Sequence, residues 1–188
     1  MPELTSNDLE KSAIDITLAL MAAAARTAPK AMGIDALVIL GLTGDEKNEI
    51  TTIMKALVAK SDPTFPKWQR DAGNVENSDA LFVVGLKKRA GSTGVNCQAC
   101  GHESCEAFGK VPKTEGHFRG PTCIFKAVDL GIAIGSAVKT AGLLNVDNRI
   151  MYRAGAAVMK SRWGDKLSLA FAVPVKLSGK SPFFDRPI

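Results

Sequence analysis

Apolar residues at helical spacing mark the first part of the chain. They recur near every third or fourth position and lead into a run of alanines, which predicts a helix over residues 7–28. Ser6 or Asn7 can cap its first turn. A second amphipathic pattern predicts a helix over residues 45–60, and a weaker one follows over residues 67–77. Prolines between the two patterns separate these helices.

Short apolar runs between the helical patterns predict strands. They cover residues 36–40, 80–86 and 167–177. The last run contains Pro174, which has no N–H to give to a sheet ladder, so we expect an edge strand or a bulge there.

A long apolar stretch predicts a further helix over residues 122–141. This stretch is apolar on nearly every side, so we expect the helix to be buried between layers. Gly131 and Gly135 lie four positions apart and would let another backbone approach closely. Asp147 can cap a last helix over residues 148–161.

These elements predict an α+β fold. Helices and strands are interspersed without a regular βαβ rhythm, which favours one antiparallel or mixed sheet covered by helices. The chain has 188 residues, 46% of them hydrophobic and 23% charged, which is enough for a sizeable core. We expect residues 1–86 and 122–188 to form one core domain. Residues 87–121 would be an insertion with little regular structure, ordered by a metal centre.

The charge pattern narrows the class of protein. The formal net charge is only +5, and the single dense basic run, at residues 87–89, is expected to be a solvated loop. We therefore expect no nucleic-acid partner, since that would need clustered basic and aromatic residues. No signal peptide and no apolar segment of about twenty residues is evident, so we expect a cytoplasmic protein with no membrane span.

All four cysteines lie in one stretch, spaced C-x2-C-x4-C-x17-C: Cys97, Cys100, Cys105 and Cys123. Four-thiolate zinc sites usually show two short cysteine pairs, and only one is present here. A [4Fe-4S] cluster is larger and accepts three neighbouring ligands and one remote ligand. The spacing favours this cluster, with zinc as the alternative. Unligated thiols or disulfides are least favoured, because polar residues surround the cysteines and the cytosol keeps thiols reduced.

Residues around the cysteines can stabilise a negatively charged centre. Gly101 eases a left-handed turn, and Cys123 falls in the first turn of the long predicted helix, where free N–H groups favour negative charge. Lys110, Lys113 and Arg119 can add positive potential. The two histidines of the segment are expected to be exposed or to support the ligands: His102 and His117.

The cysteine pattern resembles the small four-cysteine [4Fe-4S] domain of corrinoid iron–sulfur proteins and of a ferredoxin-like subunit of membrane electron-transport complexes. The matching residues are Cys97, Cys100, Gly101, Cys105 and Cys123. Further stretches contribute at residues 129–139, 145–153 and 182–186. Together they resemble an uncharacterised bacterial and archaeal family described as containing a ferredoxin domain.

The end of the first predicted helix resembles nitroreductase-type flavoproteins. Arg26 and Thr27 match the stretch that contacts the flavin phosphate in that family, and Lys30 lies near the place of its second basic residue. The order of helices and strands is similar too. This resemblance implies a nitroreductase-like fold, a homodimer and FMN bound between the subunits.

Three functions remain open from the sequence. The first is an iron–sulfur redox protein that transfers single electrons to a redox partner that the sequence does not identify. The second is an FMN-dependent reductase. The third is a non-enzymatic module in which zinc or an iron–sulfur centre only holds the insertion in place.

Overall fold

The computed structural model describes residues 3–184 of the chain. Its α-helices are α1 (Ser6–Thr27), α2 (Gly44–Ala56), α3 (Phe65–Glu76), α4 (Cys105–Lys110), α5 (Ile124–Leu143) and α6 (Tyr152–Val158). Its strands are β1 (Leu37–Leu42), β2 (Ala80–Lys87), β3 (Thr114–Glu115), β4 (Arg119–Gly120), β5 (Asp147–Asn148) and β6 (Leu167–Lys176). Short 3-10 turns cover Ala31–Gly33 and Gly164–Lys166.

The main sheet has four strands in the order β1-β2-β6-β5. Each neighbouring pair is antiparallel; Leu37 pairs with Leu86, and Phe82 pairs with Val173. Strand β2 is buried along nearly its whole length, as a central strand should be when both faces of its sheet are covered. The predicted α+β class with an antiparallel sheet is confirmed.

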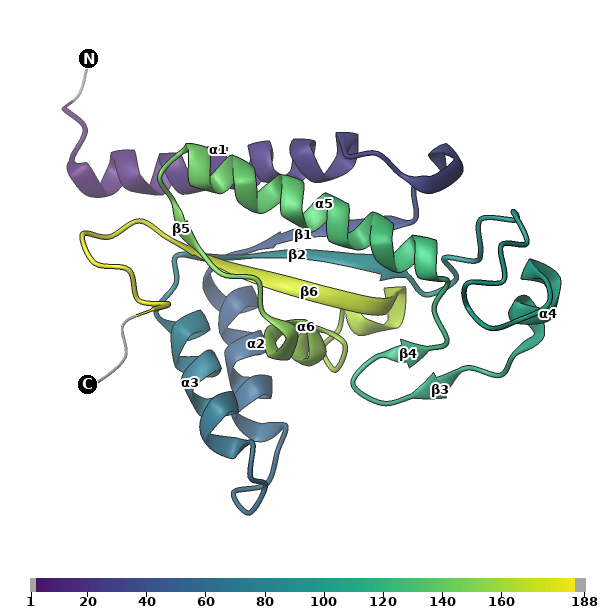
Figure 1. Cartoon of the computed structure of the whole chain (residues 1–188). Helices are drawn as coiled ribbons and strands as arrows, with labels where there is room; N and C mark the ends of the chain where they lie inside the picture. Colours follow the sequence, from purple (N-terminus) through teal and green to yellow (C-terminus); the bar gives the residue numbers. More distant parts are fainter. Residues whose placement is uncertain (1–2, 185–188) are drawn as a thin grey trace.

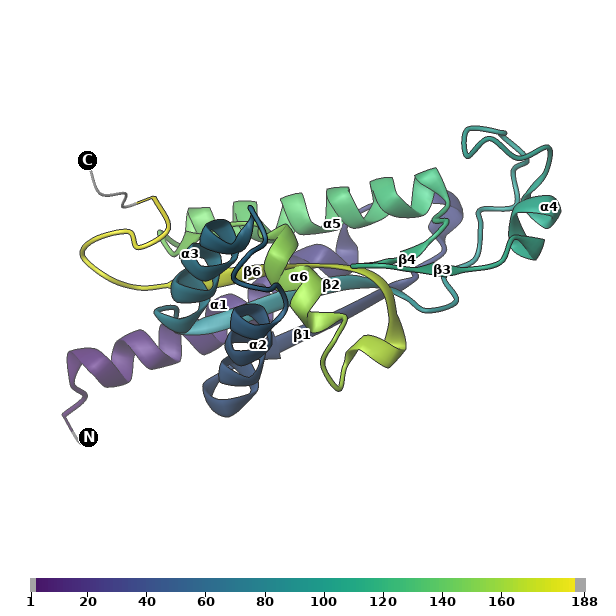
Figure 2. The same cartoon turned by 90° about the horizontal axis from the view of Figure 1, so that it is seen from below.

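Two helical layers cover the sheet. Helices α1 and α5 lie together on one face and α2, α3 and α6 on the other (Figure 1). The view from below shows the second layer in front of the strands (Figure 2). The first layer packs Met21, Leu130 and Ile134 against Phe82 of β2. The second layer packs around Met54 and other apolar side chains, so each face of the sheet carries its own core.

Helix α1 begins one residue earlier than the sequence suggested. Neither Ser6 nor Asn7 is the cap, since Thr5 takes that position. The Thr5 hydroxyl accepts a hydrogen bond from the backbone N of Asp8 at 3.3 Å, and the Asp8 carboxylate accepts one from the backbone N of Thr5 at 3.0 Å. This reciprocal pair is a capping box, and it satisfies N–H groups that the first turn leaves free.

The expected edge position of the last strand is wrong, because β6 lies between β2 and β5. The backbone of Ala172 exchanges hydrogen bonds with Met151, on the side of β6 away from β2. Pro174 faces the same side, since alternate residues of a strand point the same way. There the ladder is interrupted between Asn148, which pairs with Val175, and Met151. The missing N–H of Pro174 therefore falls in a gap of the ladder.

Two expectations for the second half of the chain are also wrong. Asp147 does not cap a helix, because it begins β5, and α6 is shorter than residues 148–161. Helix α5 is not buried on all sides, since Val128 and Ile132 are both more than 40% exposed. The sheet covers only one side of α5, so the remaining apolar side chains face outward. No helix within residues 3–184 is both long enough and apolar enough to cross a bilayer.

Candidate metal centre

The cysteine segment, residues 88–121, lies beyond the end of the main sheet where β2 finishes and α5 begins (Figure 1). It contains α4 and the hairpin β3–β4, so it has more regular structure than the sequence suggested. All four cysteines are free thiols. Cys97 is exposed, Cys100 and Cys105 are half-buried, and Cys123 is only 5% exposed.

The loop that carries the first two cysteines has a left-handed backbone at several positions. The positive φ angles are 77° at Gly94, 49° at Asn96, 59° at Gln98 and 81° at Gly101. The N–H of Gly101 closes a tight turn onto the carbonyl of Gln98 at 2.8 Å. Left-handed residues in a turn bring successive N–H groups to one concave side, where they can bind an anion. The loop is therefore shaped to receive negative charge.

The sulfur of Cys105 lies among hydrogen-bond donors. Cys105 is the first residue of α4, and its own backbone N donates to Oδ1 of Asn96 at 2.8 Å. The Ser92 hydroxyl lowers the pKa of the Cys105 thiol most, followed by the backbone N–H of Asn96 and then those of Gly94 and Val95. These donors favour the thiolate, which is the form that binds metals.

Cys123 is the N-cap residue of α5. Its carbonyl accepts the first helical hydrogen bond, from the backbone N of Ala127 at 3.0 Å, and its side chain makes no capping bond. The free N–H groups and the dipole of this 20-residue helix favour negative charge at its start. The structure thus places the remote cysteine at the positive end of the α5 dipole.

The four thiols and the polar donors of the segment are compatible with an iron–sulfur group. Within residues 3–184, no group of three or more His, Cys, Asp or Glu side chains is arranged to hold one metal ion. The hydroxyl of Thr93, which is only 6% exposed, is buried without a hydrogen-bond partner in the described chain. A cluster presents thiolate and sulfide acceptors over a larger volume than one ion, so it suits such a donor as well as the donors around Cys105.

The hairpin β3–β4 attaches the segment to the core. Nη1 of Arg119 donates to the carbonyls of Gly164 and Leu167, both at 2.6 Å. His117 lies in the hairpin loop, and its Nδ1 is 2.8 Å from the hydroxyl of Tyr152. The other histidine of the segment, His102, makes an edge contact with the ring of Phe108. Both histidines are therefore engaged with aromatic neighbours.

The two residues predicted to contact flavin phosphate lie at the end of α1. Arg26 forms an ion pair with Asp35, and the Thr27 hydroxyl donates to the carbonyl of Ala23 at 3.0 Å. Nζ of Lys30 donates to three carbonyls of the last turn of α1 and the residue after it. The end of α1 lies at the same end of the sheet as the start of α5 (Figure 1), so the structure brings the two predicted sites to one end of the molecule.

Sequence reasoning missed one buried charge near this end. Lys126 is fully buried, three residues after Cys123, and pairs with Asp129. The sequence feature that could have revealed this pair is a lysine and an aspartate three positions apart inside an otherwise apolar helix.

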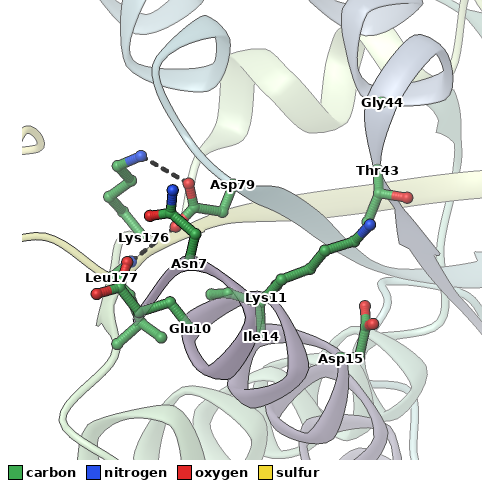
Figure 3. Close-up of a pocket in the computed structure, with 10 residues that line it drawn as sticks. All are labelled: Asn7, Glu10, Lys11, Ile14, Asp15, Thr43, Gly44, Asp79, Lys176 and Leu177. Carbon is green, nitrogen blue, oxygen red and sulfur yellow. Dashed lines mark hydrogen bonds and ion pairs between the residues drawn. The ribbon is translucent and has the colours of Figure 1, made fainter. Parts of the chain in front are cut away.

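A separate cavity of about 580 Å³ opens at the other end of the sheet, near the start of α1 (Figure 3). Nζ of Lys176 lies 2.6 Å from Oδ1 of Asp79, and the backbone N of Leu177 donates to Oδ2 of the same carboxylate at 2.8 Å. The lining contains no cysteine or histidine. These polar groups hold the end of β6 in place.

The sequence comparisons identify a family. The model of a family described as "Uncharacterized protein containing a ferredoxin domain" matches residues 119–186, which include Cys123. An uncharacterized protein from Archaeoglobus fulgidus is 42% identical over 183 residues, covering 97% of each chain.

Solved structures show the fold. A nitroreductase with bound FMN from Desulfitobacterium hafniense superposes with a TM-score of 0.55 at 17% identity, covering 96% of this chain and 82% of that one. The NADPH:FMN oxidoreductase from Vibrio harveyi, complexed with NAD+, superposes with a TM-score of 0.55 at 13% identity. The match covers 92% of this chain and 64% of that one. The chain has a nitroreductase-like fold, as the sequence suggested.

Proposed function

This chain belongs to the family of uncharacterized proteins that contain a ferredoxin domain, and we propose that it is a redox protein with one [4Fe-4S] cluster. The ligands would be the four cysteines at positions 97, 100, 105 and 123. The observation that carries this proposal is the environment of Cys105: Oδ1 of Asn96 holds its backbone N at 2.8 Å, and nearby donors, Ser92 first among them, lower the pKa of its thiol. A thiol that served only to fill space would need no such donors.

The residues of the chain have distinct parts in this function. With four thiolates, an oxidised cluster carries a charge of roughly −2, and it supplies single-electron transfer. The N–H groups of the left-handed loop and the start of α5 offset that charge. Ser92, which lies near the Cys105 sulfur, could donate to the cluster, and the buried Thr93 hydroxyl is a further unpaired donor of the segment. The exposed position of Cys97 leaves one side of the centre open to a redox partner protein.

Metal analysis of anaerobically purified protein tests the proposal. We expect brown protein with about four irons per chain. Cys105→Ser should lose most of this iron. Ser92→Ala removes a donor and no ligand, so it should keep the iron and change the reduction potential of the cluster. Colourless anaerobic protein with stoichiometric zinc would refute the cluster. A cluster that no physiological donor can reduce would instead support a structural role.

An FMN-dependent reductase is a second candidate. The nitroreductase-like fold favours it, together with the position of Arg26 and Thr27 at the same end of the sheet as Cys123. A phosphate would have to compete with Asp35 for Arg26, because these two side chains already pair. FMN titration of the purified protein tests this candidate, with Arg26→Ala as the variant and Arg162→Ala, on the opposite helical layer, as the control. Absence of saturable FMN binding would rule out the FMN-dependent reductase.

A homodimer is part of the same proposal. One outer face of α5 is apolar and exposed, and it carries small residues at close-approach positions: Ile124, Val128, Gly131, Ile132 and Gly135. No described atom lies within 4 Å of a Cβ built on Gly131 or Gly135. A contiguous apolar face marks an interaction surface, and exposed glycines let a second helix approach closely. We propose that a second copy of the chain covers this face.

A further inference from the structure

A cavity of about 490 Å³ lies beside Cys123, between the cysteine segment and the core. Its walls come from the chain just after β2, the end of α4 and the turn that leads into α5. This volume suits a small organic molecule rather than a single ion. The nearly buried side of Cys123 contributes to its lining.

The charges that line this cavity are all positive. Lys88, Arg89 and Lys113 contribute to the lining, and no aspartate or glutamate does. Within residues 3–184, the side chains of Lys88 and Arg89 make no hydrogen bond and no ion pair. Glu115 lies close enough to Lys88 for their charges to interact. Its carboxylate forms its ion pair with Arg119, however, and not with Lys88. Two cations therefore face the cavity without a bound counter-charge.

Lys113 is held in a fixed position in the cavity wall. Its Nζ donates to the carbonyl of Pro121 and lies 5.0 Å from the centre of the Phe108 ring. A lysine ammonium has three N–H donors, so two remain for a ligand. The Phe108 ring and Pro121 give the cavity an apolar side. The lining therefore combines positive charges with an apolar surface.

We propose that this cavity binds a small organic anion. The anionic group meets Lys88, Arg89 and Lys113, and the apolar body lies against Phe108 and Pro121. Ser92 and Cys123 line the same cavity, so the proposed cluster would lie at their side of it and the anion at the side of Lys88, Arg89 and Lys113. That the anion lies next to the cluster rests on the proposed function. We assign small organic carboxylates as the ligand class of this cavity.

Ligand-observed NMR with benzoate tests the binding. Saturation transfer from anaerobically purified protein should reach benzoate, whereas the neutral analogue benzamide should show little transfer. The double variant Arg89→Glu/Lys113→Glu should weaken benzoate binding at least tenfold. The control Lys60→Glu/Lys67→Glu changes the net charge equally at exposed positions outside the lining, and it should bind like the wild type. If the first double variant does not fold, Arg89→Gln should still weaken binding severalfold.

The outcomes separate this inference from the proposed function. Equal benzoate binding by wild type and by the folded Arg89 variants would overturn the anion site. So would equal transfer to benzoate and benzamide. Iron analysis of the same samples judges the cluster independently, because benzoate binding requires no iron. If both the anion site and the cluster are present, benzoate should change the electron paramagnetic resonance spectrum of the reduced cluster in the wild type. It should not change the spectrum of Arg89→Glu/Lys113→Glu.

Discussion

Nζ of Lys126 lies 3.2 Å from Oδ2 of Asp129, and both side chains are at least 95% buried at the start of α5. The same ammonium donates to the carbonyl of Ile34 at 2.8 Å, and the other carboxylate oxygen accepts from the backbone N of Ala31 at 2.8 Å. The pair therefore joins α5 to the turn between α1 and β1. Each charge is acceptable inside the protein only because the other is present.

Lys126→Met should destabilise the protein strongly. It leaves the Asp129 carboxylate buried without its cation, which costs about 3–5 kcal/mol when one partner of a buried pair is removed. Denaturant unfolding measures this loss. Lys139→Met, at an exposed position of the same helix, is the control and should change stability by less than about 0.5 kcal/mol. A loss below about 1 kcal/mol in Lys126→Met would show that water reaches the pair.

Val128→Glu should dissociate the proposed homodimer. Val128 lies near the middle of the exposed apolar face of α5 and is 46% exposed in the single chain. A carboxylate there would have to be desolvated between two helices, and the two copies would repel each other. Sedimentation of the wild type should show a dimer and that of the variant a folded monomer. Thr52→Glu, an equal charge change on the opposite layer, should remain dimeric. A monomeric wild type would contradict the proposal.

Removal of the metal should loosen the cysteine segment and spare the core. The segment contributes one fully buried apolar side chain, Phe108, outside Cys123, so it has little core of its own. Hydrogen exchange should rise most over residues 91–111. It should rise less around Arg119, because the Gly164 and Leu167 carbonyls hold that residue to the core. Strand β2 serves as the internal control. Unchanged protection over residues 91–111, or unfolding of β2, would contradict this prediction.

Asp35 should make stability depend on pH in the acid range. Burial raises the pKa of its carboxyl, but the N–H of Leu37 and the guanidinium of Arg26 together outweigh burial and lower it. A lowered carboxyl pKa stabilises the fold above the unfolded value of about 4 and loses that contribution as pH falls. The pair is partly exposed, so the contribution is at most about 1 kcal/mol.

Comparison with Asp35→Asn tests this pH dependence. The wild type should be the more stable protein at neutral pH, and the difference should shrink when denaturant unfolding is repeated well below the unfolded pKa. A difference that is constant with pH would mean that the carboxyl is not responsible.

Local periodicity was sufficient to predict the long elements, because α1 and α2 each bury a face that repeats along the sequence and β2 is a continuous apolar run. It could not find β5, since Asp147 and Asn148 form a strand only through pairing with residues near the end of β6. It also could not show that α5 keeps an apolar face exposed, because hydrophobic pattern does not say whether the sheet or another chain covers a side chain.

The candidate site, like the fold, could be predicted from the sequence only in part. Spacing alone predicts that the four cysteines share one centre, because clustered cysteines are the usual signature of a bound metal group. It could not identify Ser92 as a neighbour of Cys105, because the two residues come together only in the folded loop. The proposed anion cavity could not be predicted from the sequence either, because its cations come from two separate stretches, residues 88–89 and Lys113.

The cysteine segment leaves and rejoins the core at one place. Lys88 follows the end of β2, Cys123 precedes α5, and both line the same cavity. A chain that departs and returns at neighbouring points can be shortened at little cost in loop-closure entropy. Replacing residues 89–121 by a short Gly-Ser connection should therefore leave a folded sheet with its two helical layers. We expect the segment to be a module that such a core can gain or lose as one unit.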